Sequence, residues 1–313
     1  MVALRINIFS VDGIKVYGEN MLRTSLKYAI PVAVISFLYV QIYHSIRSTD
    51  DFENSISSEY FIFHSDGHTD TIADFSKVSN ALVVHLKAWV PSFDLLSPMD
   101  VYVLENAEEM HLFLLSYVGG GIDSRFGVYI PEKNALVTHA KAGLGTLTHI
   151  LMYPIIGNKL KDGPYWIETG ISTLFEKIYG YPRDSGFEIS YGYHNPWRLR
   201  ELGNVLDISL PEIVAAKDSV TVSQSKKRLA IMFIYQSGLF NQYLDLIMTK
   251  SKGSYETYIE AAFEKEMLSL ETDWLKYLKG IEEHRSELLN IPSSKVFKTE
   301  AEFLSEIQPY RAI

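Results

Sequence analysis

The hydrophobic period changes near Gly145, and this change restricts the possible folds more than any other feature of the sequence. Before Gly145, short runs with the two-residue alternation of strands are interleaved with helical segments. After it, apolar residues recur at the three-to-four-residue spacing of amphipathic helices. A small mixed sheet with helices, followed by a mostly helical C-terminal half, is an α+β arrangement. Strands are expected at 59–64, 100–104, 126–130 and 135–139, and helices at 70–90, 107–117, 146–153, 165–179, 196–203, 210–216, 225–249, 254–264 and 268–284.

The composition is that of a chain with a sizeable core. Hydrophobic residues make up 47% of the 313 positions and aromatic residues 13%, which argues against bulk disorder. Cys is absent, and this excludes disulfides, thiolate metal sites and a Cys nucleophile. The formal net charge is −9. Because an acidic domain repels phosphate backbones, nucleic acid is not expected as a partner.

An uncharged apolar segment at 28–44 precedes the main part of the chain. It has nearly the length of a membrane-crossing helix. Basic residues come before it and the acidic stretch 50–53 follows, so the positive-inside rule places the main domain outside the cytoplasmic membrane. We therefore expect one transmembrane signal anchor at 28–44, a membrane contact for the protein. A cleaved signal peptide and a buried core helix are the alternatives, and Met21 is a second possible start.

The segment 146–176, TLTHILMYPIIGNKLKDGPYWIETGISTLFE, is laid out like the two active-site helices of a zinc peptidase. In an H-E-x-x-H helix the two His lie one turn apart, so both imidazoles reach one metal ion. The Glu after the first His is the general base that activates zinc-bound water. A third ligand comes from a second helix, and the fourth position stays open for water.

The stretch 166–172, WIETGIS, resembles the W-x-x-E-G-x-A helix of the gluzincin peptidases, whose Glu is the third zinc ligand. More narrowly, the chain is similar to the peptidase-MA-like families of bacterial proteins over roughly 59–281. Asn195, Arg198 and Leu202, and a closing pattern from Ala262 to Leu278, agree with this resemblance. It implies a zincin-like fold for a main domain over 58–285. The other expected parts are a cytoplasmic N-terminus over 1–27, the anchor over 28–44, a tether over 45–57 and a C-terminal tail over 286–313.

The chain departs from the family's motif at the positions that carry its chemistry. The resemblance places His149 at the first ligand position and Glu168 at the third. Ile150 occupies the position of the general base, and Tyr153 that of the second His. Since Ile cannot transfer a proton and two remaining ligands make a weak zinc site, no catalytic residue and no cofactor are expected. If a residual metal site exists, its ligands are His149, Glu168 and Tyr153, and the metal is zinc.

Each of these residues also has a structural interpretation. His149 would be a partly buried helix residue hydrogen-bonded to a neighbour, Glu168 would pair with it, and Trp166 would pack in the core. The expected binding cleft contains Ala135, Leu136, Val137 and Trp166, with the strand at 135–139 taking an extended peptide by strand addition.

Three other patterns have simpler explanations. His64, Asp66, His68 and Asp70 alternate in a way that suits metal ligands, but Gly67 predicts a turn followed by a helix start. The glycines at 119–121 predict a hinge beside the cleft. The basic run Lys226-Lys227-Arg228 predicts a solvated helix start.

Three functions remain open from the sequence. The first is a membrane-anchored pseudopeptidase that binds a peptide or protein outside the membrane without cleaving it. The second is an active zinc metallopeptidase in which Tyr153 replaces the second His. The third is a structural partner in a membrane complex, with the cleft filled by side chains.

Overall fold

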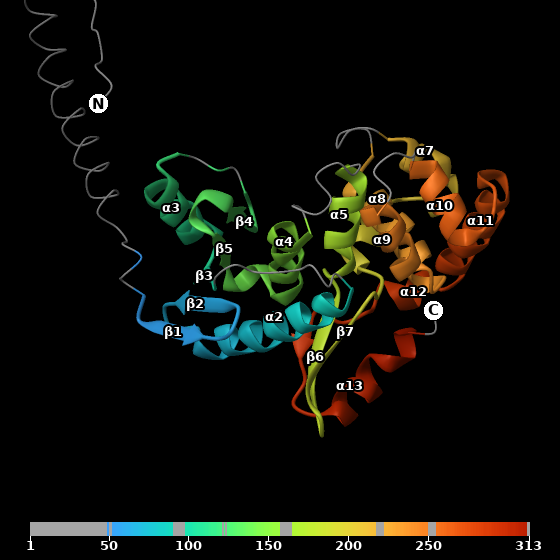
Figure 1. The fold of residues 1–313 in the computed structure, drawn as a ribbon. Coiled ribbons are helices and arrows are strands. Elements are labelled where there is room, and N and C mark those ends of the chain that lie inside the picture. The colour runs from blue at the N-terminus through green and yellow to red at the C-terminus, as the bar shows by residue number, and fades with distance from the viewer. Residues whose placement is uncertain are drawn as a thin grey trace, which may run out of the picture.

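The computed structural model describes residues 49, 52–89, 98–120, 122, 124–156, 165–216, 222–249 and 255–311. Over these residues the protein is a mixed α/β fold with twelve α-helices and two small sheets (Figure 1). The expected fold class, an α+β domain with one small sheet and a mostly helical C-terminal half, was wrong. Its second half contains a sheet, described below.

No helix in the described ranges combines the length and the apolar character that crossing a bilayer requires. The expected anchor at 28–44 and the parts N-terminal to it lie outside these ranges. The localisation inferred from that segment stays a prediction.

The first sheet has five strands in the order β1-β2-β3-β5-β4. Its three inner strands run parallel, and each edge strand is antiparallel to its neighbour. Because a parallel pair needs a crossover, a helix connects β2 to β3 and another follows β3. The strands are β1 Asn54–Ser57, β2 Phe61–Ser65, β3 Met99–Leu104, β4 Gly127–Ile130 and β5 Ala135–His139. The strand β1 lies in the segment expected as a tether.

Helices cover both faces of this sheet, and the two-residue alternation of the strands determines which side chain faces which helix. On β3, Val101 and Val103 belong to the large core with α2, Thr69–Trp89, and α4, Leu144–Ile156. Tyr102 and Leu104 point to the other face, where α3, Ala107–Val118, closes a smaller core. Burial on both faces explains why the strands are almost continuously apolar.

The predicted helix 165–179 ends early, because part of it belongs to a second sheet. Helix α5 covers Tyr165–Leu174, and the chain then forms the hairpin of β6, Ile178–Arg183, and β7, Gly186–Tyr191. The first four residues of β6 are all buried. Such a strand shows no polar alternation, so its short apolar run cannot be told from a helix by period. The outcome corrects both the helix boundary and the fold class.

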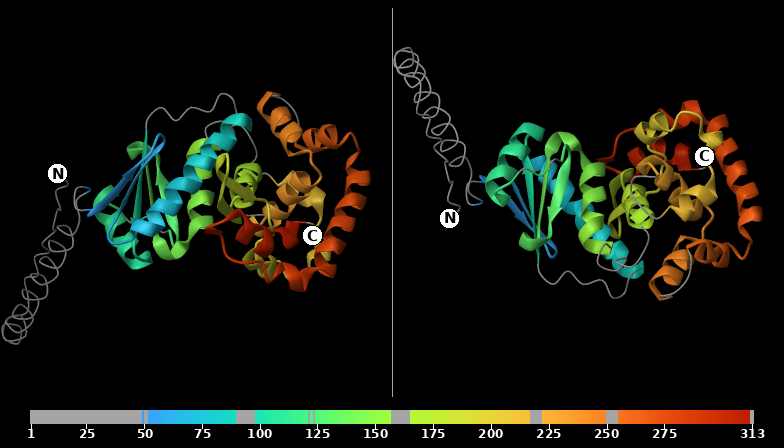
Figure 2. Two further views of the ribbon diagram at one scale, coloured as in Figure 1. Left: turned by 90° about the horizontal axis from the view of Figure 1, so that it is seen from below. Right: turned by 90° about the horizontal axis from the view of Figure 1, so that it is seen from above.

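The remaining helices form a lobe beside the first sheet (Figures 1 and 2). Most agree with the predicted ranges, but the expected helix 225–249 is two helices, with Gly238 at a φ of 75° between them. The helices are α6 Pro196–Glu201, α7 Leu210–Ala215, α8 Gln224–Gln236, α9 Phe240–Thr249, α10 Tyr255–Phe263, α11 Met267–Glu283, α12 Arg285–Leu288 and α13 Glu300–Glu306.

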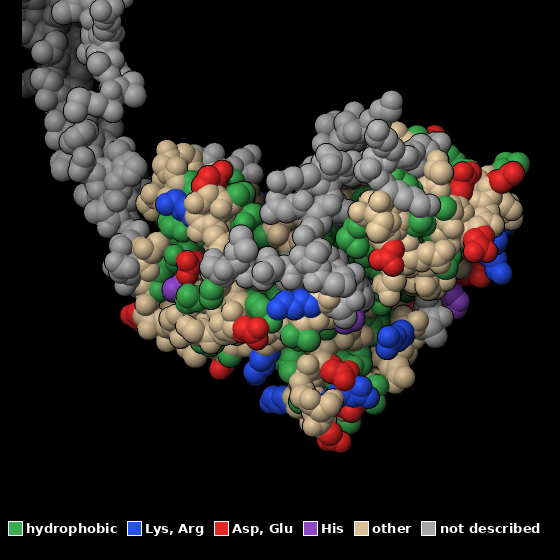
Figure 3. Space-filling view, viewed as in Figure 1, with side chains coloured by type: hydrophobic (Ala, Val, Ile, Leu, Met, Phe, Trp, Pro, Cys, Tyr) green, Lys and Arg blue, Asp and Glu red, His purple; other side chains and the backbone are tan. Residues whose placement is uncertain are grey.

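The segment expected as a C-terminal tail is part of the fold. After α12 the chain returns to the second sheet, where β8, Lys295–Val296, pairs in parallel with β6. Helix α13 follows, and the Phe303 ring stacks on Tyr181 with centroids 4.1 Å apart. The views in Figure 2 show this segment against the body of the molecule. The space-filling view in Figure 3 shows acidic and basic side chains interspersed over the described part of this face.

Candidate functional site

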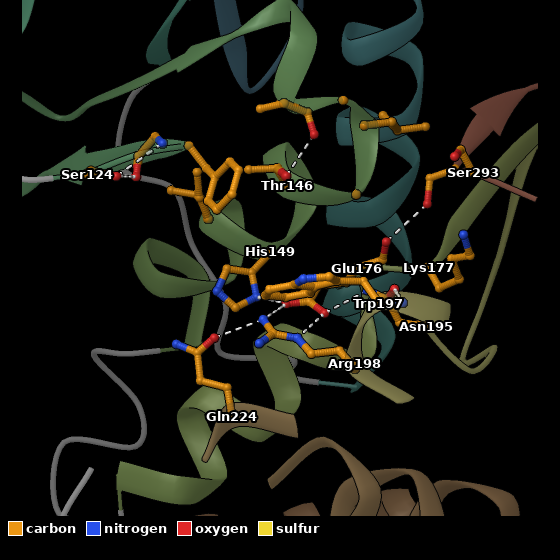
Figure 4. Close-up of a pocket in the computed structure, with 18 of the residues that line it drawn as sticks. Ser124, Thr146, His149, Glu176, Lys177, Asn195, Trp197, Arg198, Gln224 and Ser293 are labelled. Carbon is orange, nitrogen blue, oxygen red and sulfur yellow. Dashed lines mark hydrogen bonds and ion pairs between the residues drawn. The ribbon is translucent and has the colours of Figure 1, made fainter. Parts of the chain in front are cut away.

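A cavity of about 1010 Å³ lies between the edge strand β4 and helix α4, and we call it the cleft. Its lining also includes the residues after α5, the start of α6 and two residues before β8. The close-up in Figure 4 shows the side chains of His149, Glu176, Asn195, Arg198 and Gln224 close together in it. The lining residues are Ser124, Phe126, Gly127, Val128, Tyr129, Lys141, Ala142, Gly143, Leu144, Gly145, Thr146, His149, Ile150, Tyr153, Glu176, Lys177, Asn195, Trp197, Arg198, Gln224, Ser293 and Ser294.

The carboxylate of Glu176 is the centre of this polar group. Arg198 donates to it from two nitrogens, Nη2 to Oε1 at 2.5 Å and Nε to Oε2 at 3.0 Å. Asn195 Nδ2 donates to Oε2 at 3.0 Å, and His149 Nδ1 lies 3.2 Å from Oε1 at an angle poor for a hydrogen bond. Figure 4 shows these side chains converging from α4 and α6. This bidentate geometry is the strong form of an Arg–carboxylate pair.

Glu176 is ionised over the whole physiological range. Burial by itself would raise its pKa, but the contacts with His149 and Arg198 outweigh burial and lower the pKa far below the ordinary value. The side chain is only 9% exposed. A buried carboxylate that is paired in this way holds its partners in place, since breaking the pair would leave a charge without compensation.

The basic run at the start of α8 is not solvated, so that expectation was wrong. Lys227 and Arg228 are buried, with 1% and 2% of their surface exposed. Arg228 Nη1 lies 4.0 Å from Glu176 Oε2, and its Nη2 donates to the carbonyl of Tyr193. Burial lowers the pKa of Arg228 to about 10, with Glu176 opposing the shift. The residues after β7 and the end of α5 cover this helix start, which a local charge pattern cannot indicate.

His149 and Tyr153 lie one turn apart on α4 and both line the cleft. Tyr153 Oη is 3.3 Å from His149 Nε2. His149 is therefore hydrogen-bonded to a neighbour, as in its structural interpretation, and its carboxylate partner is Glu176. Ile150 is 5% exposed, and a Cβ placed on Gly127 would meet its Cδ1 at 2.6 Å. The residue at the position of the general base is thus a packing contact between α4 and β4.

The other predicted site residues lie away from the cleft. Glu168 and Trp166 are on α5 and are not part of the lining, and Trp166 is fully buried. Burial raises the pKa of Glu168. Ala135, Leu136 and Val137 are buried in β5, which pairs with β3 on one side and β4 on the other. Because β5 has no free edge, the expectation that it takes a peptide by strand addition was wrong, and the edge strand is β4.

The donors at this site do not fit zinc. His149 and Tyr153 are adjacent, but Glu168 is outside the cleft, and the carboxylate that meets His149 is already held by Arg198. Within the described ranges no group of three or more His, Asp or Glu is arranged to hold a metal ion. Arg228 next to the same carboxylate adds a positive charge, which opposes a bound cation. The alternating His64 to Asp70 residues do not form such a group either, since His64 Nε2 bonds Asp100 Oδ1 at 2.9 Å.

Two exposed aromatic side chains stand on the lining of the cleft. Phe126 precedes β4 and is 47% exposed, and Trp197 on α6 is 46% exposed. The Trp197 ring lies over the Arg198 guanidinium, with Cζ 4.1 Å from the ring centroid. Large exposed aromatic surfaces in a concave site are typical of places where ligands bind.

The sequence indicated some of these residues but not their arrangement. Asn195 and Arg198 belong to the pattern that resembles the peptidase family, but the sequence assigned them no role. Glu176 is the last residue of the segment 146–176, and the sequence assigned it no role either. No sequence pattern indicated Lys177 as a site residue. A Glu beside a Lys at the end of an amphipathic helix usually faces solvent, and only the second sheet, which follows at once, buries this pair.

Comparison with known proteins adds no assignment. No family model matches the chain, and no curated protein matches it in sequence.

Proposed function

We propose that this domain binds an extended peptide, or an extended segment of a protein, along β4 in the cleft and does not cleave it. The observation that supports this most is the position of β4. It is the outermost strand of the first sheet, and Gly127, Val128 and Tyr129 of this strand line the cleft. An edge strand facing a cavity is the arrangement used for peptide recognition by strand addition.

The hydrogen bonds of Gly127 indicate which backbone groups would meet the peptide. Its N–H donates to Ser124 Oγ at 3.2 Å and its carbonyl accepts from the same hydroxyl at 2.5 Å. Both groups therefore point away from β5. Because hydrogen-bonding directions alternate along an antiparallel strand, the N–H and C=O of Tyr129 face the same outer side. They form the docking edge of the proposed site.

We propose binding without cleavage because of the side chains beside the cleft. Ile150, which follows His149, packs against β4 and has no group that can move a proton. His149 Nδ1 faces Glu176 and Nε2 faces Tyr153 Oη. Glu176 is held by Arg198 and Asn195. The polar group is better suited to fixing the position of α4 against α6 than to activating water.

The test begins with short random peptides displayed on phage and selected against the full chain. Selected peptides are then synthesised with a fluorescent label and their affinities measured by polarisation. We expect Tyr129→Pro, which removes the outward N–H, to weaken binding about five- to tenfold, the value of one hydrogen bond. Proline is tolerated on edge strands where the N–H is unpaired. Trp197→Ala should weaken binding by a similar factor.

Matched controls separate binding from folding. Tyr129→Ala keeps the N–H and should lose less affinity than Tyr129→Pro. Leu268→Ala alters a side chain that is 84% exposed and does not line the cleft, so it should change nothing. Thermal unfolding checks that each variant is folded. Selected peptides that bind all four variants equally, or cleavage of the peptides by the purified chain, would contradict the proposal.

A further inference from the structure

Lys177 is a buried cation without a partner in the cleft. Only 6% of its surface is exposed, and it belongs to the lining. It makes no hydrogen bond or ion pair with any residue that the structure describes. Figure 4 shows its amino group beside Ser293, apart from the side chains that surround Glu176. Its Nζ is not one of the unpartnered side-chain atoms that are closed off from solvent, so the ammonium faces the cleft, where an anion could replace water as its partner.

The charges around Lys177 are out of balance. Arg198 and Arg228 share the single buried carboxylate of Glu176, and Glu201 adds only a partly exposed partner for Arg198 at 3.6 Å. Burial, together with the positive charge of Arg228, lowers the pKa of Lys177 to about 8. At neutral pH most Lys177 side chains are therefore protonated, in a place where positive charge exceeds negative charge.

The start of α4 increases this positive character. Gly143, Leu144, Gly145 and Thr146 line the same cavity as Lys177. The first turn of α4 contains no acidic residue, so no local carboxylate offsets its dipole. The N–H groups of Thr146 and Leu147 donate to the Gly143 carbonyl, which leaves those of Leu144 and Gly145 for a ligand. Gly145 also packs closely on the residue before Lys177, since a Cβ there would clash with the Glu176 carbonyl oxygen. The helix start therefore lies against the backbone that immediately precedes Lys177, and both line the same cavity.

We infer that Lys177 and the N-terminus of α4 form an anion subsite that binds a carboxylate of the peptide held along β4. This inference rests on the proposed function and specifies its ligand. A single negative charge suits the subsite because one ammonium and one helix terminus lack a counterion. The carboxylate is either the C-terminus of the peptide or an Asp or Glu side chain.

The subsite is tested first without any peptide. Full-length protein is labelled with ¹³C at the ε-carbon of lysine, and the resonance of Lys177 is assigned from its loss in Lys177→Met. Titration with sodium acetate at constant ionic strength should shift this resonance saturably, and neutral acetamide should not shift it. Lys141 is the control, since it lines the cleft but its side chain is 67% exposed, and its resonance should not saturate. A Lys177 response that does not saturate, or that acetamide reproduces, overturns the inference.

The second arm identifies the source of the carboxylate. Peptides selected as described above are compared with C-terminally amidated copies and with copies in which Asp and Glu are replaced by Asn and Gln. Loss of the bound carboxylate should weaken affinity about tenfold or more, the value of a charged hydrogen bond. Lys177→Met should give the same loss and should abolish the difference between the peptide forms.

The two proposals fail in different ways. If the selected peptides depend on Tyr129 and Trp197 but bind equally well with and without carboxylates, the subsite is overturned and the peptide site stands. If acetate saturates Lys177 but no selected peptide depends on Tyr129, the peptide site is overturned and a subsite for small carboxylates stands.

Discussion

The carboxylate of Glu176 joins side chains from three helices. His149 comes from α4, Arg198 from α6 and Arg228 from α8. Each of these partners is largely buried, so water cannot replace the carboxylate if it is lost. At the scale of single residues, this group links α4 to α6 and α8.

Glu176→Gln should destabilise the protein strongly, because it leaves the buried guanidinium of Arg198 without its counter-charge. Removing one partner of a buried pair typically costs about 3–5 kcal/mol in the free energy of unfolding. The matched control is Glu188→Gln, which removes a partner of Arg183 in an exposed pair and should have a much smaller effect. Urea denaturation of both variants measures the difference. Equal effects would contradict the role given to Glu176.

Lys177 should make stability depend on pH in the alkaline range. Its pKa is about 8 in the folded chain, below the ordinary value of 10.5, so between these values the unfolded chain binds more protons. Stability then rises with pH across this window, by an amount on the order of 2–3 kcal/mol. Lys177→Met removes this contribution. Two charged groups lie near Lys177. Glu176 stays ionised throughout this range. Arg228 has a pKa of about 10 and begins to lose its own proton above pH 9.5, so the comparison is cleanest from pH 8 to 9.5. Urea denaturation at several pH values should show the free energy of unfolding of the wild type rising with pH relative to that of Lys177→Met. A difference between the two proteins that does not change with pH would contradict this assignment.

Among the elements, α5 and α8 make the closest helix contact that bears on the site. Gly170 on α5 lies against α8, where an added Cβ would meet Ile231 Cγ1 at 2.5 Å and the Lys227 carbonyl oxygen at 3.3 Å. This approach brings the start of α8, and with it Arg228, toward Glu176. The Gly is required by the packing, since its φ is that of an ordinary helix residue.

Gly170→Ala should therefore destabilise the protein although Ala favours helices. The gain in helix propensity is about 1 kcal/mol, and overpacking a core typically costs about 1–3 kcal/mol, so the clash outweighs the gain. Gly280→Ala in α11 is the matched control, because nothing lies within 4 Å of its added Cβ. That variant should gain stability. Thermal unfolding should show a lower melting temperature for Gly170→Ala and a higher one for Gly280→Ala. A higher melting temperature for both would mean that α5 and α8 can move apart without loss of stability.

For the whole molecule, the last residues of the described chain complete the second sheet. Phe297, Phe303 and Ile307 are buried in the main core. Ser294 Oγ accepts from the Ile178 N–H and donates to the Glu176 carbonyl, which ties this segment to the residues beside the cleft. The C-terminal segment is thus a structural element of the site and not an appendage.

A chain ending at residue 290 should lose most of its stability. Each of the three buried apolar side chains contributes about 1.5–3 kcal/mol, and their sum is comparable to the 5–15 kcal/mol of a typical domain. A chain ending at residue 307 keeps all three and serves as the control. Circular dichroism and hydrogen exchange of the two chains measure the effect. A truncated chain as stable as the control would show that β8 and α13 are dispensable.

The local pattern of the sequence was sufficient for many elements and for part of the site. The helices 70–90, 107–117 and 268–284 and the hairpin strands are confirmed within a residue or two, because their periods depend only on which side of each element is buried. His149 and Tyr153 could be placed side by side because a helix brings positions four apart together. The second sheet could not be predicted, since a strand buried on both faces loses its alternation.

The tertiary structure decided what the charged residues do. Arg228 looked solvated and Glu176 and Lys177 had no assigned role, because the burial of a charge depends on chain segments far away in the sequence. The fold brings His149, Arg198 and Arg228 around the carboxylate of Glu176, and it exchanges Glu168 for Glu176 as the partner of His149. The sequence by itself determined that a helix carries His149 without a general base beside it. Only the packing of distant elements determined which charges meet there, because electrostatic partners are chosen by distance in space and by the removal of water.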